Sequence, residues 1–424
     1  MNHELAYGKG KLSFTLPGGV TPTIIVAGDR PALPDPHAAA DFAVKNPEGT
    51  PPLVEMLRAR APKSVVVIVN DVTRPTPYDV ILPPLLNAFS EAGVTDEQVT
   101  FLVATGVHDV HTDAQNREFY GDAIVDRFKV VSHNAEARGT HTLFGKVISG
   151  YDFWVNTLAV EADFLITVGV VMPHYFAGYS GGRKSILPGV VGKETVEKNH
   201  ARMVELMDNL PPIDENPVSL EMIDAARKVG VDFILNVVMN DRKEVVSIHA
   251  GDLVKAWRSA VTVSASIFEV PFDKQVDICI TCASGYPRDI NAYQAQKALD
   301  HADRITRPGG TIVLAAECPM GYGERVFEEW MSRGWTPRQV MEEVKRHFVI
   351  GGHKAYGFAK VAAEKEYWLI SSFNERDTQR LYAKKAATVQ EAVDAAFVRH
   401  GPQASCVYMP QGSVSLPVLR QAAK

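Results

Sequence analysis

Short runs of β-branched and other apolar residues alternate with stretches of helical periodicity along most of the chain. This alternation is typical of parallel βαβ units, in which a helix carries the chain back between two buried strands. YDVILPPLLNAFSEAG and SLEMIDAARKVG show the helical pattern. The strands predicted in the first part of the chain are SVVVIVN from Ser64, QVTFLVAT from Gln98, DRFKVVS from Asp126, DFLITVGVV from Asp163 and DFILNVV from Asp232.

A second series of the same kind follows after the segment VPFDKQ, near residue 270. A proline and polar residues interrupt both patterns there, which indicates a domain boundary. The second series comprises VDICITC, a helix around NAYQAQKALDHADRI, TIVLAAE, paired helices from Glu324 to His347, EYWLISS, VQEAVDAAFVRHG and CVYMP.

We therefore predict an α/β protein of two domains, each built on a mostly parallel sheet flanked by helices, with the active site in the cleft between them. A chain of 424 residues is long enough for two cores, because single cores stop growing at roughly 250 to 300 residues. Residues 1–270 would form a cofactor-binding and catalytic domain, and residues 271–424 a domain that closes over the substrate. The tail from Gln411 onward would pack back on the first domain.

The charge and composition of the chain reduce the classes of binding partner to consider. The formal charge of −6 argues against nucleic acid, because a phosphate backbone requires a basic face. The start MNHELAYGKG lacks the features of a secretory signal, and no apolar run is long enough to span a membrane. We expect a cytoplasmic protein.

The pair Cys279 and Cys282 lies in a strand-like run, where positions three apart face opposite ways, so we expect buried thiols rather than a metal or redox pair.

Reactive side chains follow three of the predicted strands. Asp71 and Arg74 follow the first, His108 the second and His174 the fourth. Ligands of open parallel sheets bind beyond the carboxyl ends of strands, so these side chains should meet. Two histidines at one crevice can take and give protons near neutral pH, from either side of a bound carbon.

Each of these residues also has a structural interpretation. Asp71 alone would fit a helix cap equally well. His111 competes with His108 for the role of base, and His133 follows another strand but fits a structural role better.

The glycine-rich run AGYSGGRKS contains Lys184. It resembles a phosphate-binding loop, but the Walker pattern requires Gly directly before Lys, and Arg183 occupies that place. Glycines still let backbone amides approach an anion. Lys184 therefore fits either a phosphate contact or a nucleophile activated by partial burial.

Two further clusters lie on predicted helices. Val196, His200 and Met203 share one face of KETVEKNHARMVELM, so His200 is either a core histidine or an inward metal ligand. In the second domain, spacings of three and four residues gather side chains that would grip a carboxylate or form a solvated face. These are Tyr293, Gln294 and Lys297.

Together the motifs resemble the nickel-dependent lactate racemase family, whose members use a nickel-pincer nucleotide. The resemblance is strongest in the segment PHYFAGYSGGRKSILPGVVGKETVEKNH, which runs from Pro173 to His200. DVTRP from Asp71, TGVH from Thr105 and AYQAQKAL from Ala292 agree with it in the family's order. These motifs span the first domain and enter the second.

The resemblance implies a nickel pyridinium bisthiocarboxylate mononucleotide, joined covalently to Lys184 through a thioamide, with His200 as the protein ligand to nickel. His108 and His174 would be the acid/base pair. The other implied cofactor contacts are Asp71, Arg74, Gly181, Gly182, Arg183 and Ser185, and the implied substrate contacts are Tyr293, Gln294, Lys297 and Arg74.

The implied reaction inverts carbon 2 of a small 2-hydroxy acid. One histidine removes the hydroxyl proton while hydride leaves the adjacent carbon for the pyridinium ring, giving a transient 2-keto acid. Hydride then returns to the other face. Proteins that build and insert the cofactor would be partners.

This chain departs from the family pattern at Asp109, where an arginine is expected after the first catalytic histidine. An acid there disfavours an anionic substrate tail, so lactate, longer aliphatic, aromatic and sugar acids all remain candidate substrates. Tyr356 and Phe358 compete for the aromatic contact to the substrate. The alternatives are an NAD-dependent oxidoreductase or epimerase, weakened by the lack of a GxGxxG fingerprint, and a non-catalytic protein that binds a nucleotide or nickel.

Overall fold

The structure is a computed structural model that describes residues 2–174, 176–206 and 211–420. The chain divides into two compact units. Residues 29–267 form one, here called the central unit after its place in the sequence. Residues up to 28 join those from 268 onward in the other, the terminal unit. The sequence had placed residues 1–28 in the first domain, because local patterns do not reveal which distant strands such a segment will join.

The central unit is built on a six-stranded sheet with the order β13-β12-β9-β4-β5-β6. All neighbours are parallel except β13, which is antiparallel to β12 at the edge. The five predicted strands are present. Their bounds are β4 (Val65–Asn70), β5 (Val99–Ala104), β6 (Lys129–Ser132), β9 (Phe164–Val170), β12 (Phe233–Met239) and β13 (Val245–Gly251).

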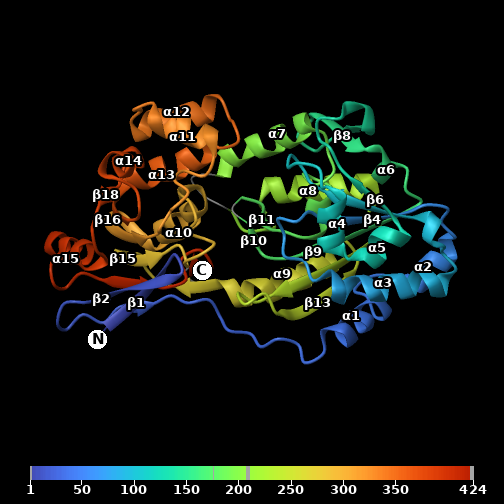
Figure 1. Ribbon diagram of the computed structural model, residues 1–424, viewed down its shortest axis with the longest axis horizontal. Coiled ribbons are helices and arrows are strands. Elements are labelled where there is room, and N and C mark those ends of the chain that lie inside the picture. The colour runs from blue at the N-terminus through green and yellow to red at the C-terminus, as the bar shows by residue number, and fades with distance from the viewer. Residues whose placement is uncertain (1, 175, 207–210, 421–424) are drawn as a thin grey trace. The chain divides into compact units, whose positions relative to one another are not determined.

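Alternation along the strands divides the core of this unit into two layers. Val65, Val67 and Val69 of β4 face a cluster that includes helices α1, α2 and α3 (Figure 1). On the opposite face, the turn at Gly182 packs near Ile234. The helices are α1 (Pro36–Lys45), α2 (Leu53–Arg60), α3 (Tyr78–Ala92), α4 (Asp113–Tyr120), α5 (Asp122–Arg127), α6 (Thr157–Val160), α7 (Lys193–Ala201), α8 (Pro217–Val229) and α9 (Lys255–Phe268).

Two small antiparallel ladders complete the central unit. One pairs β7 (His141–Lys146) with β8 (Asp152–Asn156). The other pairs β10 (Pro173–His174) with β11 (Gly178–Tyr179), and it directly precedes the glycine-rich turn. The second ladder therefore anchors the loop that runs from His174 to Lys184.

The terminal unit contains a six-stranded, all-parallel sheet with the order β18-β17-β16-β15-β19-β3. Its strands are β3 (Thr23–Ile24), β15 (Val276–Cys282), β16 (Thr306–Ala315), β17 (Glu366–Ile370), β18 (Lys384–Lys385) and β19 (Cys406–Met409). Its helices are α10 (Ala292–Ile305), α11 (Arg325–Ser332), α12 (Pro337–Arg346), α13 (Gly352–Glu364), α14 (Glu375–Arg380) and α15 (Val389–His400).

Both ends of the chain contribute to this unit. The hairpin of β1 (Asn2–Tyr7) and β2 (Gly10–Thr15) contributes Leu5 and Phe14 to its core. Near the C-terminus, β20 (Leu416–Leu419) pairs with β14 (Glu269–Phe272). The tail was expected to pack on the first domain; its partner β14 spans the predicted boundary near residue 270 and belongs to the terminal unit.

All four cysteines are free and buried. Burial raises the pKa of the Cys279 and Cys282 thiols, so neither is poised as a thiolate, and the interpretation as structural thiols is confirmed. Within the described residues, no helix combines the length and apolar character that crossing a membrane requires.

Candidate active site

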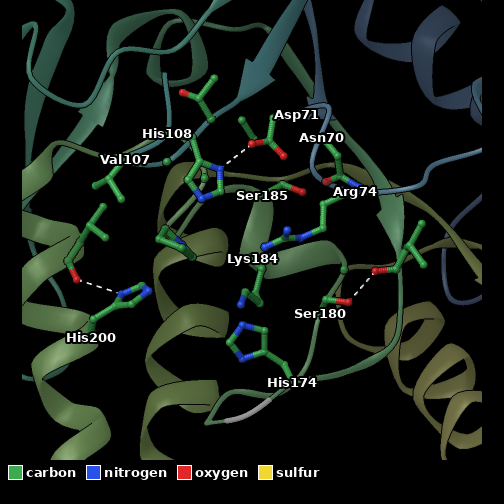
Figure 2. A pocket seen from close by; sticks show the side chains of 18 residues that line it. Asn70, Asp71, Arg74, Val107, His108, His174, Ser180, Lys184, Ser185 and His200 are labelled. Atoms are coloured by element: carbon green, nitrogen blue, oxygen red, sulfur yellow. Dashed lines mark hydrogen bonds and ion pairs between the residues drawn. The ribbon is translucent and has the colours of Figure 1, made fainter. Parts of the chain in front are cut away.

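The predicted strand ends of the central sheet meet around one cavity. Strands β4, β5 and β9 end at Asn70, Ala104 and Val170. Because β5 and β9 flank β4 on opposite sides, their carboxyl ends form the kind of crevice where open parallel sheets bind ligands. The cavity measures about 160 Å³. Its lining includes Asn70, Asp71, Arg74, Val107, His108, His174, Ser180, Gly181, Lys184, Ser185 and His200 (Figure 2).

The glycine-rich turn begins with two residues in the left-handed region, Gly181 at φ +82° and Gly182 at φ +46°. A Cβ on Gly181 would lie 2.5 Å from Val171 and 2.8 Å from Asn236, so only glycine fits. The turn then continues as a short 3-10 helix, Gly182–Ser185. Its geometry directs Lys184 into the cavity.

The Lys184 side chain is partly exposed and lies near other cations. Desolvation lowers the pKa of its amine well below the usual value, and the charges of Arg74 and Arg183 lower it further. A lowered pKa favours the uncharged amine, which is the form that acts as a nucleophile. In Figure 2 the amine lies between the rings of His108 and His174. Of the two interpretations of Lys184, the structure therefore favours the nucleophile.

Two predicted cofactor contacts, Gly182 and Arg183, do not line the cavity. Arg183 is fully buried. Its guanidinium stacks 3.7 Å from the centroid of the Trp257 ring and donates to the carbonyls of Ala177 and Tyr179. The left-handed glycines turn the side chain of residue 183 into the core, so its predicted contact with the cofactor stays a prediction that this side chain does not support.

His108 is held by Asp71. Nδ1 of His108 lies 2.6 Å from a carboxylate oxygen of Asp71, whose side chain is only 5% exposed. Burial alone would raise the Asp71 pKa, but hydrogen bonds from His108 and Thr73 outweigh it and lower that pKa. An ionised Asp71 favours the tautomer with the proton on Nδ1, which leaves Nε2 of His108 as a base. Because Pro77 and not Asp71 precedes helix α3, the helix-cap interpretation is wrong.

The hydrogen bond at Nδ1 of His174 runs in the opposite direction to that at Nδ1 of His108. Nδ1 of His174 accepts a long hydrogen bond, 3.4 Å, from the backbone N–H of Ala177. This contact favours the tautomer with the proton on Nε2. Phe176 packs edge-on against the ring at 4.8 Å between centroids. One cavity thus contains a histidine arranged as a proton acceptor and another arranged as a proton donor.

His200 lies at the end of α7, where its Nδ1 is 3.0 Å from the carbonyl oxygen of Val196. Burial, followed by the positive charge of Lys184, lowers its pKa to about 4. The ring is therefore neutral, with Nε2 unprotonated, as metal ligation requires. Among the described residues, no group of three or more His, Cys, Asp or Glu side chains is placed to hold a metal ion. A metal at His200 would need further ligands from elsewhere.

Three neighbouring residues from the sequence motifs lie outside the cavity lining. His111 accepts a hydrogen bond from the backbone N–H of Val72. His133 is buried, with a pKa lowered to about 4 by burial and a contact of 3.0 Å to the Val191 carbonyl. Asp109 is exposed. His111 and His133 are thus structural, and Asp109 is not part of the described cavity.

The residues expected to bind the substrate carboxylate lie in the terminal unit on α10. The side chain of Asn291 caps this helix by accepting from the N–H of Gln294. Burial, followed by the charge of Arg288, lowers the pKa of Lys297 to about 8. Tyr293 is partly exposed. Neither aromatic candidate for a substrate contact has an accessible side chain, because Tyr356 and Phe358 are both buried.

Several residues that support the site were not predicted. Asn236 accepts a hydrogen bond of 3.1 Å from the N–H of Gly182. Trp257 donates from its indole N–H to the Ser180 carbonyl at 2.9 Å. Both lie far along the chain from the loop they hold, on a strand and a helix that read as ordinary core elements. Only Ser180 lay within a motif that sequence reasoning had singled out.

Comparison with known proteins gives matches along nearly the whole chain. Residues 7–209 match the family described as the lactate racemase N-terminal domain, and residues 272–418 match the lactate racemase C-terminal domain. A lactate racemase from Thermoanaerobacterium thermosaccharolyticum is 35% identical over 81% of this chain and 80% of its own length. One from Lactiplantibacillus plantarum is 31% identical over 87% of this chain and 88% of its own. The apoprotein structure of the lactate racemase from T. thermosaccharolyticum superposes with a TM-score of 0.90 at 30% identity, covering 99% of this chain and all of that one.

Proposed function

Because the chain belongs to the lactate racemase family, and is therefore an isomerase, we propose that it inverts carbon 2 of a small 2-hydroxy acid by transferring a hydride and a proton. The observation that carries this proposal is the cavity itself. It brings together two histidines of opposite hydrogen-bonding state, a lysine whose pKa is lowered well below its usual value, and a neutral histidine.

The residues present fit a nickel-pincer nucleotide. The amine of Lys184 would be joined to it, since its lowered pKa favours the uncharged amine, the form that makes a covalent bond. Nε2 of His200 would be the protein ligand to nickel, a metal that imidazole suits. Arg74, Ser185 and the turn at Gly181 would hold the nucleotide, because a cation, a hydroxyl and open backbone suit a phosphate. When bound, this group supplies the hydride acceptor.

The two histidines would exchange protons with the substrate hydroxyl. Nε2 of His108 accepts the hydroxyl proton, and the ionised Asp71 stabilises the imidazolium that forms. When it carries a second proton, His174 donates from Nε2 to the oxygen as hydride returns from the opposite face, and its ring is left neutral. Because either enantiomer is a substrate, the two rings swap roles in the reverse direction.

Binding of the substrate carboxylate would fall to cationic and amide groups. Arg74 lines the cavity, and Lys297 with Gln294 and Tyr293 provides a second set of donors on one helix. A charge-assisted hydrogen bond to the carboxylate fixes the substrate and leaves its hydroxyl carbon to react. Other proteins would build and insert the cofactor, so they are the expected partners.

The decisive experiment uses protein made with the cofactor-synthesis machinery. Intact-mass and metal analysis measure loading, and a chiral assay over a panel of 2-hydroxy acids measures turnover. His108→Ala and His174→Ala should each lower kcat by about 100-fold or more, because a positioned acid or base contributes on the order of 10² to 10⁴ in rate. Both variants should keep the adduct mass and the nickel.

His37→Ala is the matched control, since His37 is exposed on a helix of the same unit. It should retain full activity. A loaded protein that inverts none of the acids would contradict the proposal and favour a non-catalytic carrier. Loss of nickel in the two histidine variants would instead assign these rings to cofactor binding.

A further inference from the structure

Arg183 and Lys184 are consecutive cations that face opposite ways. Lys184 lines the cavity, whereas Arg183 is fully buried on the other side of the same turn. The proposed chemistry uses Lys184 and leaves Arg183 without a role. A buried guanidinium is costly to desolvate, so its position calls for an explanation.

The guanidinium of Arg183 holds the loop that precedes it. It donates to the carbonyls of Ala177 and Tyr179 at 3.0 Å each and to the hydroxyl of Ser219 at 3.0 Å. A longer contact of 3.5 Å reaches the Ser180 carbonyl. Among the described residues, it makes no ion pair within 4.0 Å. Its two Nη groups are thus devoted to backbone carbonyls and one hydroxyl on α8, while its buried Nε has no hydrogen-bond partner among the described residues.

Trp257 completes this arrangement from α9. The guanidinium lies 3.7 Å from the centroid of its ring, within the range of a strong cation–π contact. The indole N–H donates to the same Ser180 carbonyl that Arg183 approaches. The planar guanidinium is therefore fixed between a ring and the loop, an arrangement that a lysine ammonium would not reproduce.

The loop held in this way carries two residues of the active site. Ala177 accepts from Arg183 through its carbonyl and donates through its N–H to Nδ1 of His174. The second residue whose carbonyl accepts from Arg183 is Tyr179, which belongs to β11, and β11 pairs with β10. On the far side of the turn the chain continues directly to Lys184. One buried side chain thus contacts the backbone that places both His174 and Lys184.

We propose that Arg183, clamped by Trp257, is a positioning residue that fixes the loop from His174 to Lys184 and so keeps the Lys184 amine inside the cavity. The inference rests on the proposed function for the importance of Lys184. Its test does not, because the amine can be probed in protein made without the cofactor. The nearby positive charge of Arg183 acts in the same direction by disfavouring a second cation.

The test measures how fast small amine reagents label Lys184 as pH changes. Full-length protein made without cofactor is labelled with isotope-coded acetic anhydride from pH 6.5 to 9, and peptides are quantified by mass spectrometry. In the unmodified chain we expect a flat profile for Lys184, that is, a rate that rises by much less per pH unit than that of an exposed lysine, because the pKa of its amine is lowered. Lys193, an exposed lysine whose pKa is raised by Glu136, should rise about ten-fold per pH unit.

Three graded variants weaken the clamp: Arg183→Met, Arg183→Lys and Trp257→Leu. We expect Lys184 in each folded variant to become pH-dependent like Lys193, with Arg183→Lys failing to restore the flat profile despite keeping the charge. Arg258→Met is the matched control. Arg258 lies 5.9 Å from the same ring but pairs with Asp214 rather than with the loop, so its removal should leave the profile flat.

A flat Lys184 profile in folded Arg183 and Trp257 variants would overturn the proposal and reduce the pair to core packing. Melting temperature is recorded beside each profile, because a purely structural role would lower it without changing the slope. A chain that lacks racemase activity but shows the expected profiles would contradict the proposed function alone.

Discussion

The carboxyl ends of the strands form a ligand-binding type of edge in both sheets, but the residues that line the two edges differ in their chemistry. Beyond β4, β5 and β9 of the central unit lies a cavity lined by Lys184, His108 and His174. Beyond β16 and β17 of the terminal unit lies a larger cavity, about 410 Å³, whose lining contains no histidine or lysine. The carboxyl edge of a parallel sheet therefore indicates where a ligand can bind, and the loops decide what chemistry follows.

The difference lies in how each edge satisfies its polar groups. In the terminal cavity the Tyr322 hydroxyl contacts Asp377, which also pairs with Arg380. In the central cavity, the Lys184 amine has no hydrogen bond or ion pair with any described residue, and its pKa is lowered well below the usual value by desolvation and by nearby cations. Groups that neutralise one another give a stable surface, whereas an amine without a partner is prepared for a ligand.

Among the substitutions that test this difference between the two cavities, Lys184→Ala should have the largest effect. Removing the amine removes the point of covalent attachment, so the adduct mass should vanish and racemase activity should fall by roughly 1,000-fold or more. Intact-mass spectrometry and the chiral assay measure the two effects. Lys193→Ala, an exposed control on the same unit, should change neither. An adduct that survives in Lys184→Ala would place the attachment elsewhere.

Asp71→Asn should have the next largest effect. The amide can donate to Nδ1 of His108, which would put the proton on Nε2 and remove the base. We expect kcat to fall by about 100-fold, within the range for loss of a positioned base, with cofactor loading unchanged. Asp109→Asn is the control, because Asp109 adjoins His108 in sequence but does not line the cavity. Equal activity in both variants would show that the pairing with Asp71 is not needed.

A smaller effect is expected in the pH profile of substrate binding. Lys297 is cationic below its pKa of about 8 and neutral above it, so its grip on a carboxylate should weaken as pH rises through that value. We expect kcat/KM to fall by up to about ten-fold per unit above pH 8. Lys297→Met should give a low value without this decline, whereas the exposed control Lys384→Met should keep it. A decline that persists in Lys297→Met would assign the titration to another group.

The smallest effect should come from the terminal cavity. Asp377→Asn changes its principal carboxylate, and we expect less than about a two-fold change in kcat and KM with a modest loss of melting temperature, since a partly buried ion pair is weakened. Steady-state kinetics and thermal denaturation measure both. A large loss of activity would mean that the second sheet edge also takes part in the reaction.

Patterns in the sequence predicted the strands that matter most. β4, β5, β9 and β12 are parallel and buried on both faces, so they read as continuous apolar runs. The motifs around His108, Lys184 and His200 likewise predicted which side chains would share one cavity. Local pattern and local motif were sufficient because each of these features depends on residues close together in the chain.

The features that the sequence did not predict depend on contacts between residues far apart in the chain. The inward direction of Arg183 depends on two left-handed glycines and on Trp257, which is more than 70 positions away, so the motif alone did not indicate that its side chain faces the core. Similarly, the pairing of β3 with β19 joins residues near 24 to residues near 408. No periodicity in either segment indicates its partner.

That last pairing has a consequence for synthesis on the ribosome. The stretch from residue 29 to residue 267 can acquire its own core as soon as it has been translated, because its contacts are internal. Strand β3, by contrast, precedes this stretch in the chain, and its partner β19 follows it. β3 therefore waits for its neighbour until the whole stretch between them has been made, and during that interval its edge stays exposed to chaperones and proteases.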